Sequence, residues 1–208
     1  MLLPDRVIDS LGKCAHVEYD VGFVLDTSGS MQPKDWDIEK KFVKDLVKGL
    51  KMSPSGGHAA VTLFSSTANL EIKFSDHTNF NSFKAAVDGL PKANGGTRMD
   101  TGMYVALEQM FNTSNGMRPS AAKSVLLITD GQNGVPNWQD PVRNQYRARK
   151  IKIVVIGAGN VNKAELKRLV IDHQEDLHIA SNMEALKMGK LFKDVGEGLC
   201  DGMTNFIS

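Results

Sequence analysis

Four short apolar runs, separated by segments with helical spacing, constrain the fold of this chain most strongly. The runs cover residues 20–26, 58–66, 124–131 and 152–159. Strands that are apolar throughout are typical of a mostly parallel sheet with helices packed on both faces. A chain of 208 residues is long enough for one such three-layer domain. The pattern therefore predicts a single α/β domain.

The remaining segments complete the expected order of elements. Residues 69–75 alternate apolar and charged side chains a short link after the second run, which predicts an antiparallel hairpin at the sheet edge. A short strand is expected at 176–180. Helices are expected at residues 34–51, 80–90, 100–111, 139–149, 162–171 and 184–196. The last helix carries a predicted core stripe made of Leu186, Met188, Leu191, Phe192 and Val195.

The charge balance and the hydropathy pattern exclude several classes of protein. The chain has 25 basic and 24 acidic residues, a net charge of +1, which gives no support for nucleic-acid binding or a polybasic membrane surface. No apolar run approaches the roughly 20 residues of a membrane span. Residues 1–13 lack the basic and apolar regions of a signal peptide, so a secreted form would carry its signal outside this chain.

Two cysteines, Cys14 and Cys200, lie near opposite ends of the chain. They are either two unrelated buried thiols or one disulfide that joins the ends. Domain termini often lie close together, so we favour the disulfide. In the chain-entropy model a bridge over such a long loop stabilises the fold by about 5 kcal/mol. A structural disulfide also indicates an oxidising compartment.

Two of the apolar runs end in an acid, and hydroxyl side chains follow nearby. Ligands of open α/β sheets bind beyond the carboxyl ends of the strands, where two carboxylates facing each other would favour a bound cation. The candidate ligands are all oxygen donors: Asp26, Ser28, Ser30, Thr97 and Asp130. Hard oxygen ligands of mixed charge suit Mg²⁺, with Mn²⁺ nearly as good and Ca²⁺ less so. An open coordination position on this ion would attract an external carboxylate.

Three pieces of sequence, DTSGS (26–30), GGT (95–97) and TDG (129–131), carry a resemblance to a known family. Together they resemble the metal-ion-dependent adhesion site of von Willebrand factor type A domains and integrin inserted domains. That pattern is Asp-x-Ser-x-Ser, then a loop Thr, then a strand-end Asp, and all five positions are present. The intervals of 71 residues from the first Asp to the Thr and 33 from the Thr to the last Asp are similar to those of the family.

The resemblance implies a three-layer, Rossmann-like fold with five parallel strands and one antiparallel edge strand. The domain would cover residues 18–200, between a lead-in at 1–17 and a tail at 201–208. Three hydroxyls are implied to contact the cation directly or to alternate with water: those of Ser28, Ser30 and Thr97. The two acids would often act through water molecules. A Glu or Asp of a partner protein would complete the octahedron.

Further residues are expected around this site or on the surface. The predicted rim of the crevice consists of Gln32, Arg98, Asn133 and Asn137. Trp138 is expected to pack over the following helix, and Asp100 to cap or favour the start of its helix. Asn112 begins an Asn-Thr-Ser glycosylation motif. The five histidines show no zinc spacing and are taken as structural or surface residues.

Catalysis is the weaker functional hypothesis. A phosphatase that forms an aspartyl phosphate needs a second acid where this chain has Ser28, and a serine side chain has no useful acidity. No Gly-x-Ser-x-Gly turn surrounds Ser28 or Ser30, and no phosphate-binding loop occurs. We therefore expect a protein that is not an enzyme.

Two binding functions remain after this comparison. The first is an extracellular adhesion or matrix module, one part of a longer secreted protein, with collagen as the first candidate ligand. The second is a structural or assembly domain of the matrix that self-associates or acts as a spacer, with a secondary metal site.

Overall fold

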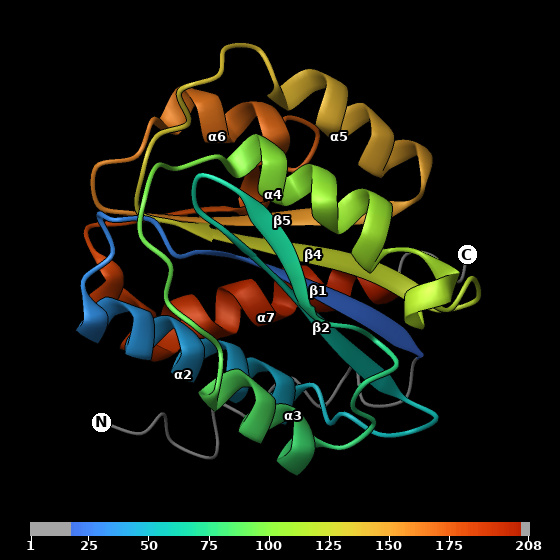
Figure 1. Ribbon diagram of the computed structural model, residues 1–208. Coiled ribbons are helices and arrows are strands. Elements are labelled where there is room, and N and C mark those ends of the chain that lie inside the picture. Colours follow the sequence, from blue (N-terminus) through green and yellow to red (C-terminus); the bar gives the residue numbers. More distant parts are fainter. Residues whose placement is uncertain (1–17, 205–208) are drawn as a thin grey trace.

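The structure, a computed structural model, describes residues 18–204, with side chains up to residue 200. A six-stranded sheet crosses its centre in the order β3-β2-β1-β4-β5-β6 (Figure 1). The strands are β1 (Tyr19–Asp26), β2 (Gly57–Phe64), β3 (Ala68–Ile72), β4 (Ala122–Thr129), β5 (Ile151–Ala158) and β6 (Leu177–Ala180). Neighbouring strands are parallel except for β2 and β3, which form the antiparallel hairpin at one edge. The predicted fold class is therefore confirmed.

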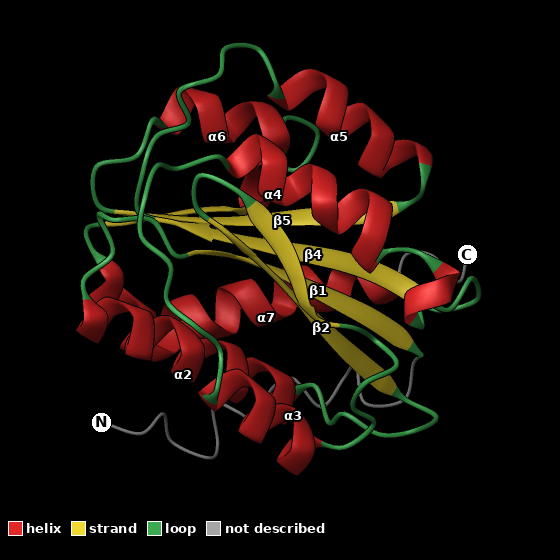
Figure 2. Ribbon diagram, viewed as in Figure 1, coloured by secondary structure: helices red, strands yellow, loops and turns green. Residues whose placement is uncertain are grey.

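Helices cover both faces of the sheet and give three layers (Figure 2). The helices are α2 (Pro33–Gly49), α3 (Phe80–Asp88), α4 (Met99–Val105), α5 (Gln139–Ala148), α6 (Lys163–Leu169) and α7 (Gly189–Thr204). α2, α3 and α7 pack on one face, and α4, α5 and α6 on the other. Alternate residues of β1 face the two layers, since Phe23 and Leu25 join the first core and Val24 the second.

The sequence of α2 explains its position on the sheet. Pro33 occupies the first turn, where its missing N–H group costs nothing. Trp36, Phe42 and Leu46 recur at helical spacing and are buried against the sheet. One acid, Glu39, shares this inward face and is fully buried. An acid at such a position needs an explanation beyond packing.

The strand predicted at 69–75 ends earlier, at Ile72, because a turn replaces its last residues. The amide of Lys73 donates to the carboxylate of Asp76 at 2.8 Å instead of to the neighbouring strand. The amide of Asp76 donates in return to the carbonyl of Lys73 at 3.2 Å. This local pairing competes with the sheet ladder.

Two predicted helices differ from the observed ones. The helix expected at 100–111 begins as α4 but ends in the π-helical turn Ala106–Met110. The helix expected at 184–196 is divided into the 3-10 turn Met183–Lys187 and helix α7. Met188 lies at the break with extended backbone (φ −83°, ψ 127°), so its side chain leaves the helical stripe. It is 60% exposed, and its predicted burial was wrong.

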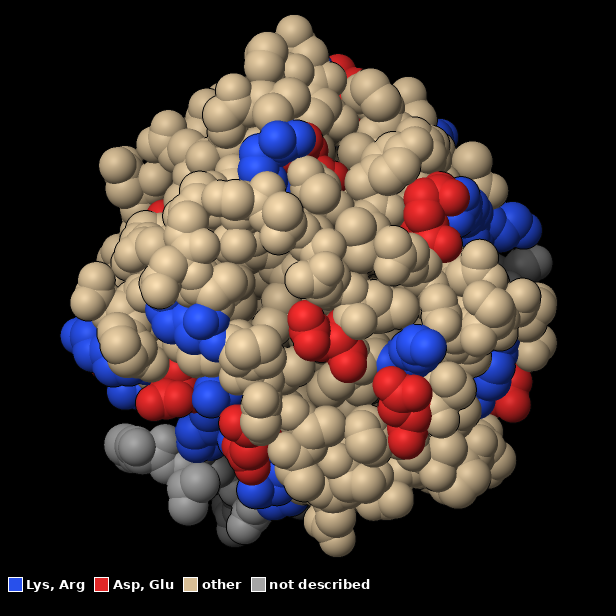
Figure 3. Space-filling view, viewed as in Figure 1, with Lys and Arg blue, Asp and Glu red and all other residues tan. Residues whose placement is uncertain are grey.

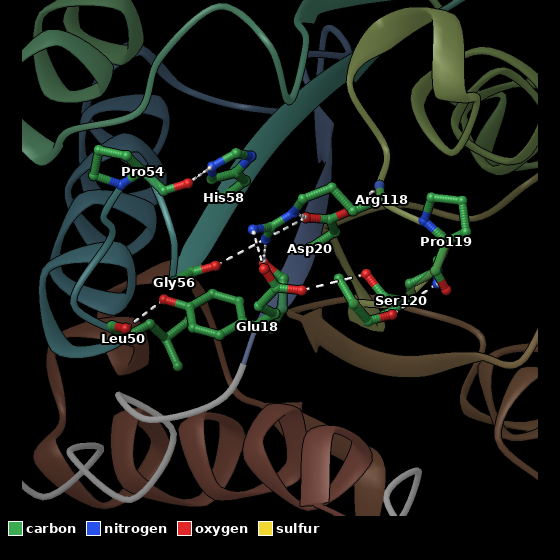
Figure 4. A network of polar contacts seen from close by, with 12 residues as sticks. Glu18, Asp20, Leu50, Pro54, Gly56, His58, Arg118, Pro119 and Ser120 are labelled. Atoms are coloured by element: carbon green, nitrogen blue, oxygen red, sulfur yellow. Dashed lines mark hydrogen bonds and ion pairs between the residues drawn. The ribbon is translucent and has the colours of Figure 1, made fainter.

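A buried ion pair fastens the end of the sheet where β1 and β2 begin (Figure 4). The guanidinium of Arg118, from the loop before β4, donates to Oδ1 of the fully buried Asp20 at 2.9 and 2.7 Å. It also donates to the carbonyls of Tyr19 and Gly56, at 2.7 and 2.8 Å. The amide of Arg118 donates to Oδ2 of Asp20 at 2.6 Å. One side chain thereby connects β1 with the start of β2.

The predicted disulfide and the predicted domain boundaries lie at or beyond the limits of the described residues. Cys200 is buried in α7 and is disulfide-bonded, while Cys14 lies outside the described residues. The predicted lead-in at 1–17 and the last residues of the predicted tail, 205–208, also lie outside them. The domain boundaries therefore stay predictions.

None of the helices within residues 18–204 is both long and apolar enough to cross a bilayer. On the face shown in Figure 3, basic and acidic side chains stand in small interspersed groups, without a broad patch of one sign. This distribution agrees with the balanced composition.

Candidate metal site

Asp26 is the last residue of β1 and is held by two hydrogen bonds. It is fully buried. The amide of Ser28 donates to its Oδ1 at 2.8 Å, and the hydroxyl of Thr129, the last residue of β4, donates to its Oδ2 at 2.6 Å. The carboxylate is therefore fixed between the carboxyl ends of two neighbouring parallel strands, as expected for a ligand site in this sheet.

A chain of hydroxyls joins the loop after β1 to the loop after β4. The hydroxyls of Ser28 and Ser30 lie 2.9 Å apart. The hydroxyl of Ser30 donates to Oδ1 of Asp130 at 2.7 Å. Ser28 is buried, Ser30 is exposed and Asp130 is half-buried, so this line of oxygens starts in the interior, reaches solvent at Ser30 and ends at a half-buried carboxylate.

Thr97 reaches the same edge on a third loop, between α3 and α4. The amide of Gly29 donates to the carbonyl of Gly95 at 2.9 Å, which connects this loop to the loop after β1. Gly95 has φ +127°, a conformation that favours glycine. A Cβ atom on Gly131 would lie 2.8 Å from Oγ1 of Thr97, so the Thr97 hydroxyl lies beside the loop after β4. Loops carrying the five predicted ligands thus meet at one sheet edge.

The two acids of the site are held in an environment that disfavours their charge. Burial is the main cause that raises the pKa of Asp26, and repulsion from Asp130 raises it further, while hydrogen bonds from Ser28 and Thr129 lower it. Burial also raises the pKa of Asp130, aided by the charge of Asp35 and opposed by the hydrogen bond from Ser30. A cation at this edge would offset both effects.

Glu39 is a residue of this region that the sequence reasoning missed. Among the described residues, neither of its carboxylate oxygens has a hydrogen-bond partner. Burial raises its pKa well above the ordinary value, and repulsion from Asp26 and then from Asp130 adds to this. The signal was present in the sequence as an acid on the apolar face of α2. These orphaned oxygens, with the hydroxyls and carboxylates nearby, fit a hard divalent cation.

Lys92 is the second residue missed, and it connects two of the loops. Its ammonium donates to the carbonyls of Ser28 at 3.2 Å and Ala93 at 3.1 Å, and to Oδ1 of Asn94 at 3.3 Å. Its charge lowers the pKa of Asp130. The contact with Ser28 spans 64 positions of sequence. Only the folded chain reveals it.

The predicted rim residues have different surroundings. Gln32 is exposed immediately before α2, and Asn133 is half-buried after β4. Arg98 forms a two-pronged pair with Asp100 at 2.8 and 2.7 Å, which joins the end of the loop that carries Thr97 to the first turn of α4. Asn137 accepts a hydrogen bond from the α6 residue Arg168 at 3.1 Å. A role for the rim in ligand contact stays a prediction.

The other residues singled out by sequence lie apart from this cluster of oxygens. Trp138 is buried and donates from Nε1 to Oε1 of Glu165 on α6 at 2.7 Å, which agrees with a packing role. Asn112 is exposed and caps a 3-10 turn by accepting from the amide and the hydroxyl of Ser114, at 3.0 and 2.9 Å. Its glycosylation stays a prediction.

A second group of possible metal ligands lies near the start of β6. His173, Glu175 and Asp176 have ligand atoms within 4.8 Å of one another. The buried carboxylate of Asp176 is already paired with the ammonium of Lys152 at 3.1 Å, and the other two residues are exposed. This group is therefore a weaker candidate than the cluster around Asp26.

The sequence of this chain matches a known domain family and is similar to several known proteins. Residues 20–194 match the sequence profile of the von Willebrand factor type A domain. Integrin alpha-M of Mus musculus is 32% identical over 174 residues, which cover 79% of this chain and 14% of the integrin. Matrilin-1 of Mus musculus is 27% identical, with 87% of this chain and 36% of the relative covered. The collagen alpha-5(VI) chain of Mus musculus is also 27% identical, over 84% of this chain and 6% of the collagen chain.

Solved structures show the same similarity. Proximal thread matrix protein 1 from the mussel byssus superposes with a TM-score of 0.81 at 28% identity, covering 90% of this chain and 47% of that one. A structure of that protein with a zinc-occupied metal-ion-dependent adhesion site has a TM-score of 0.79 at 28% identity and covers 90% and 46%. This chain thus spans less than half the length of each of these relatives.

Proposed function

Because the chain belongs to the von Willebrand factor type A family, we propose that it is an extracellular module that binds proteins in adhesion or in the matrix. In this proposal an acidic side chain of the ligand is engaged through a divalent cation. One observation carries the proposal, namely the convergence at one sheet edge of loops that bring Asp26, Ser28, Ser30, Thr97 and Asp130.

The residues at this edge would contribute two kinds of oxygen to the cation. The hydroxyls of Ser28, Ser30 and Thr97 provide neutral oxygens, and Asp26 and Asp130 provide charge. When bound, Mg²⁺ or Mn²⁺ supplies a Lewis-acidic position that accepts a carboxylate oxygen of the ligand. Hydroxyl oxygens donate little charge, which leaves this position attractive to an anion. Ser30, the exposed member of the chain of oxygens between Ser28 and Asp130, marks where the ligand approaches.

The relatives support an extracellular setting and a protein ligand. They include an integrin, a matrilin, a collagen chain and a protein of the mussel byssus thread matrix. The disulfide-bonded Cys200 supports an oxidising compartment. We propose that the chain is a binding module and not an enzyme, with collagen as the first ligand to test.

Binding measured with and without the cation tests this proposal. Immobilised protein is incubated with fibrillar collagen and with a matrix extract, in Mg²⁺ and in EDTA. Ser28→Ala removes a proposed ligand, and Ser120→Ala removes an exposed hydroxyl at the opposite end of β4 as the matched control. We expect Mg²⁺-dependent capture by the wild type and by Ser120→Ala only. Capture that persists in EDTA and in Ser28→Ala would refute the proposal.

A second candidate function is assembly within a matrix. The structural relative that is a thread matrix protein of the mussel byssus favours it. In this case the domain self-associates or serves as a spacer and the cation is secondary. Light scattering in Mg²⁺ and in EDTA separates the two functions. Oligomers that are insensitive to EDTA support assembly, whereas a monomer that needs Mg²⁺ for ligand capture supports adhesion.

A further inference from the structure

Glu39 occupies a position that packing alone does not account for. It lies in the second turn of α2, on the same inward face as Trp36 and Phe42, and is fully buried. Apolar side chains fill this face elsewhere in the helix. An ionisable group that replaces one of them loses its hydration, which is costly unless a partner inside the protein compensates.

The described residues supply no such partner. Neither oxygen of Glu39 accepts a hydrogen bond. The charges that act on it most strongly belong to Asp26 and Asp130, and both have the same sign as Glu39. The backbone N–H of Asp26 lies close enough to lower the pKa of Glu39, an effect smaller than that of burial and of the two like charges, and this places Glu39 against the end of β1.

Lysines close to Glu39 in the sequence are paired with other acids. Three lysines of α2 bind other acids, in the pairs Lys40–Asp37, Lys41–Asp45 and Lys44–Asp88. Lys92, at the site itself, donates to the carbonyl of Ser28 and to two groups of its own loop. The hydroxyls of Ser30 and Thr129 donate to the other two carboxylates. A cation at the edge where Asp26 and Asp130 lie would compensate the charge of Glu39, which without a cation is neutralised by protonation.

We propose that Glu39 is a positioning residue of the cation site, a third carboxylate on its interior side that strengthens cation binding without contacting the ligand. This inference rests on the cation of the proposed function. A ligand set rich in neutral hydroxyls attracts a cation weakly, and a fixed negative charge behind it adds Coulomb attraction in a medium of low dielectric. The added attraction scales with the charge of the ion, so a trivalent ion gains more than a divalent one.

Calorimetric titration of three proteins with Mg²⁺, Mn²⁺ and La³⁺ tests the inference. Glu39→Gln keeps the shape and removes the charge. Glu165→Gln is the matched control, a buried glutamate on α6 that accepts hydrogen bonds from Trp138 and Gln139 at 2.7 and 2.8 Å. We expect Glu39→Gln to weaken Mg²⁺ binding by at least about tenfold and La³⁺ binding by a larger factor. Glu165→Gln should bind all three ions like the wild type.

A merely structural glutamate predicts a different result. In that case Glu39→Gln and the wild type bind each ion equally, and the inference is overturned while the proposed function stands. A wild type that binds none of the ions overturns both. Thermal unfolding without cation is the second readout, where Glu39→Gln should melt no lower than the wild type. Glu39→Met replaces Glu39→Gln if the latter does not fold.

Discussion

At the scale of single residues, a glycine after β4 decides where a proposed metal ligand can lie. A Cβ atom on Gly131 would come within 2.8 Å of Oγ1 and 3.0 Å of Cγ2 of Thr97, so Thr97 has to shift in Gly131→Ala. We expect this variant to weaken Mg²⁺ binding by roughly tenfold through loss of one oxygen ligand. Gly134→Ala is the control, because nothing lies within 4 Å of its added Cβ. Equal affinities in calorimetry would count against Thr97 as a ligand.

The sequence predicted the residues of the site unevenly. Asp26, Ser28 and Ser30 form one local motif, and the alternation of strands and helices brings a distant Thr and Asp to the same edge. Glu39 was missed because helical periodicity was used to find apolar faces and not the acid within one. Lys92 was missed because its partner Ser28 is distant in sequence, and no local pattern encodes that contact.

At the scale of elements, Arg118 holds the ends of β1 and β2 together. Its replacement by Met leaves Asp20 buried without its counter-charge and removes bonds to two backbone carbonyls. Breaking a buried pair from one side leaves an uncompensated charge, so Arg118→Met should destabilise the fold by about 3 kcal/mol. Urea unfolding measures this, with the exposed Arg147→Met as control. A loss as small as that of the control would mean that the pair contributes little.

Elements whose ends depend on tertiary contacts were the least predictable. The strands and the bodies of the helices follow from periodicity, which reports burial directly. The π-helical turn at the end of α4 and the break at Met188 do not, because both keep the mixed apolar and polar pattern of a helix while the backbone geometry changes. A helical pattern in sequence cannot distinguish 3-10, α and π turns of a few residues.

At the scale of the whole molecule, the site makes stability depend on pH and on cation. Folding raises the pKa of Asp26, Glu39 and Asp130. Such groups bind more protons folded than unfolded between the two pKa values, so the free energy of unfolding falls as pH rises through that interval. In EDTA we therefore expect these three acids to lower the melting temperature as the pH rises above about 4. Adding Mg²⁺ at pH 7 should raise the melting temperature again.

Other acids also make stability depend on pH, and the pKa of Asp140 is lowered instead of raised. Comparing the wild type with Glu39→Gln cancels these contributions, because both proteins share them. Melting of the wild type and Glu39→Gln is compared between pH 4 and pH 8 in EDTA. The wild type should lose more stability than the variant as pH rises. Parallel curves for the two proteins would show that Glu39 does not contribute.

The overall architecture was the most predictable level. Apolar strands alternating with helices allow few arrangements, and the observed sheet has the predicted parallel strands and antiparallel edge. The order of the strands places β1 beside β4, which explains why Asp26 and Asp130, 104 positions apart in sequence, lie together at the carboxyl ends of these two central strands. The topology therefore connects the fold directly to the candidate site.

The central claim is that one divalent cation binds between the loops after β1 and β4. Anomalous diffraction from crystals grown with Mn²⁺ tests it most directly. We predict a peak bounded by the hydroxyls of Ser28, Ser30 and Thr97, with the carboxylates of Asp26 and Asp130 close enough to act directly or through water. A map without that peak, or with Mn²⁺ only at the group of His173, Glu175 and Asp176, would contradict the account.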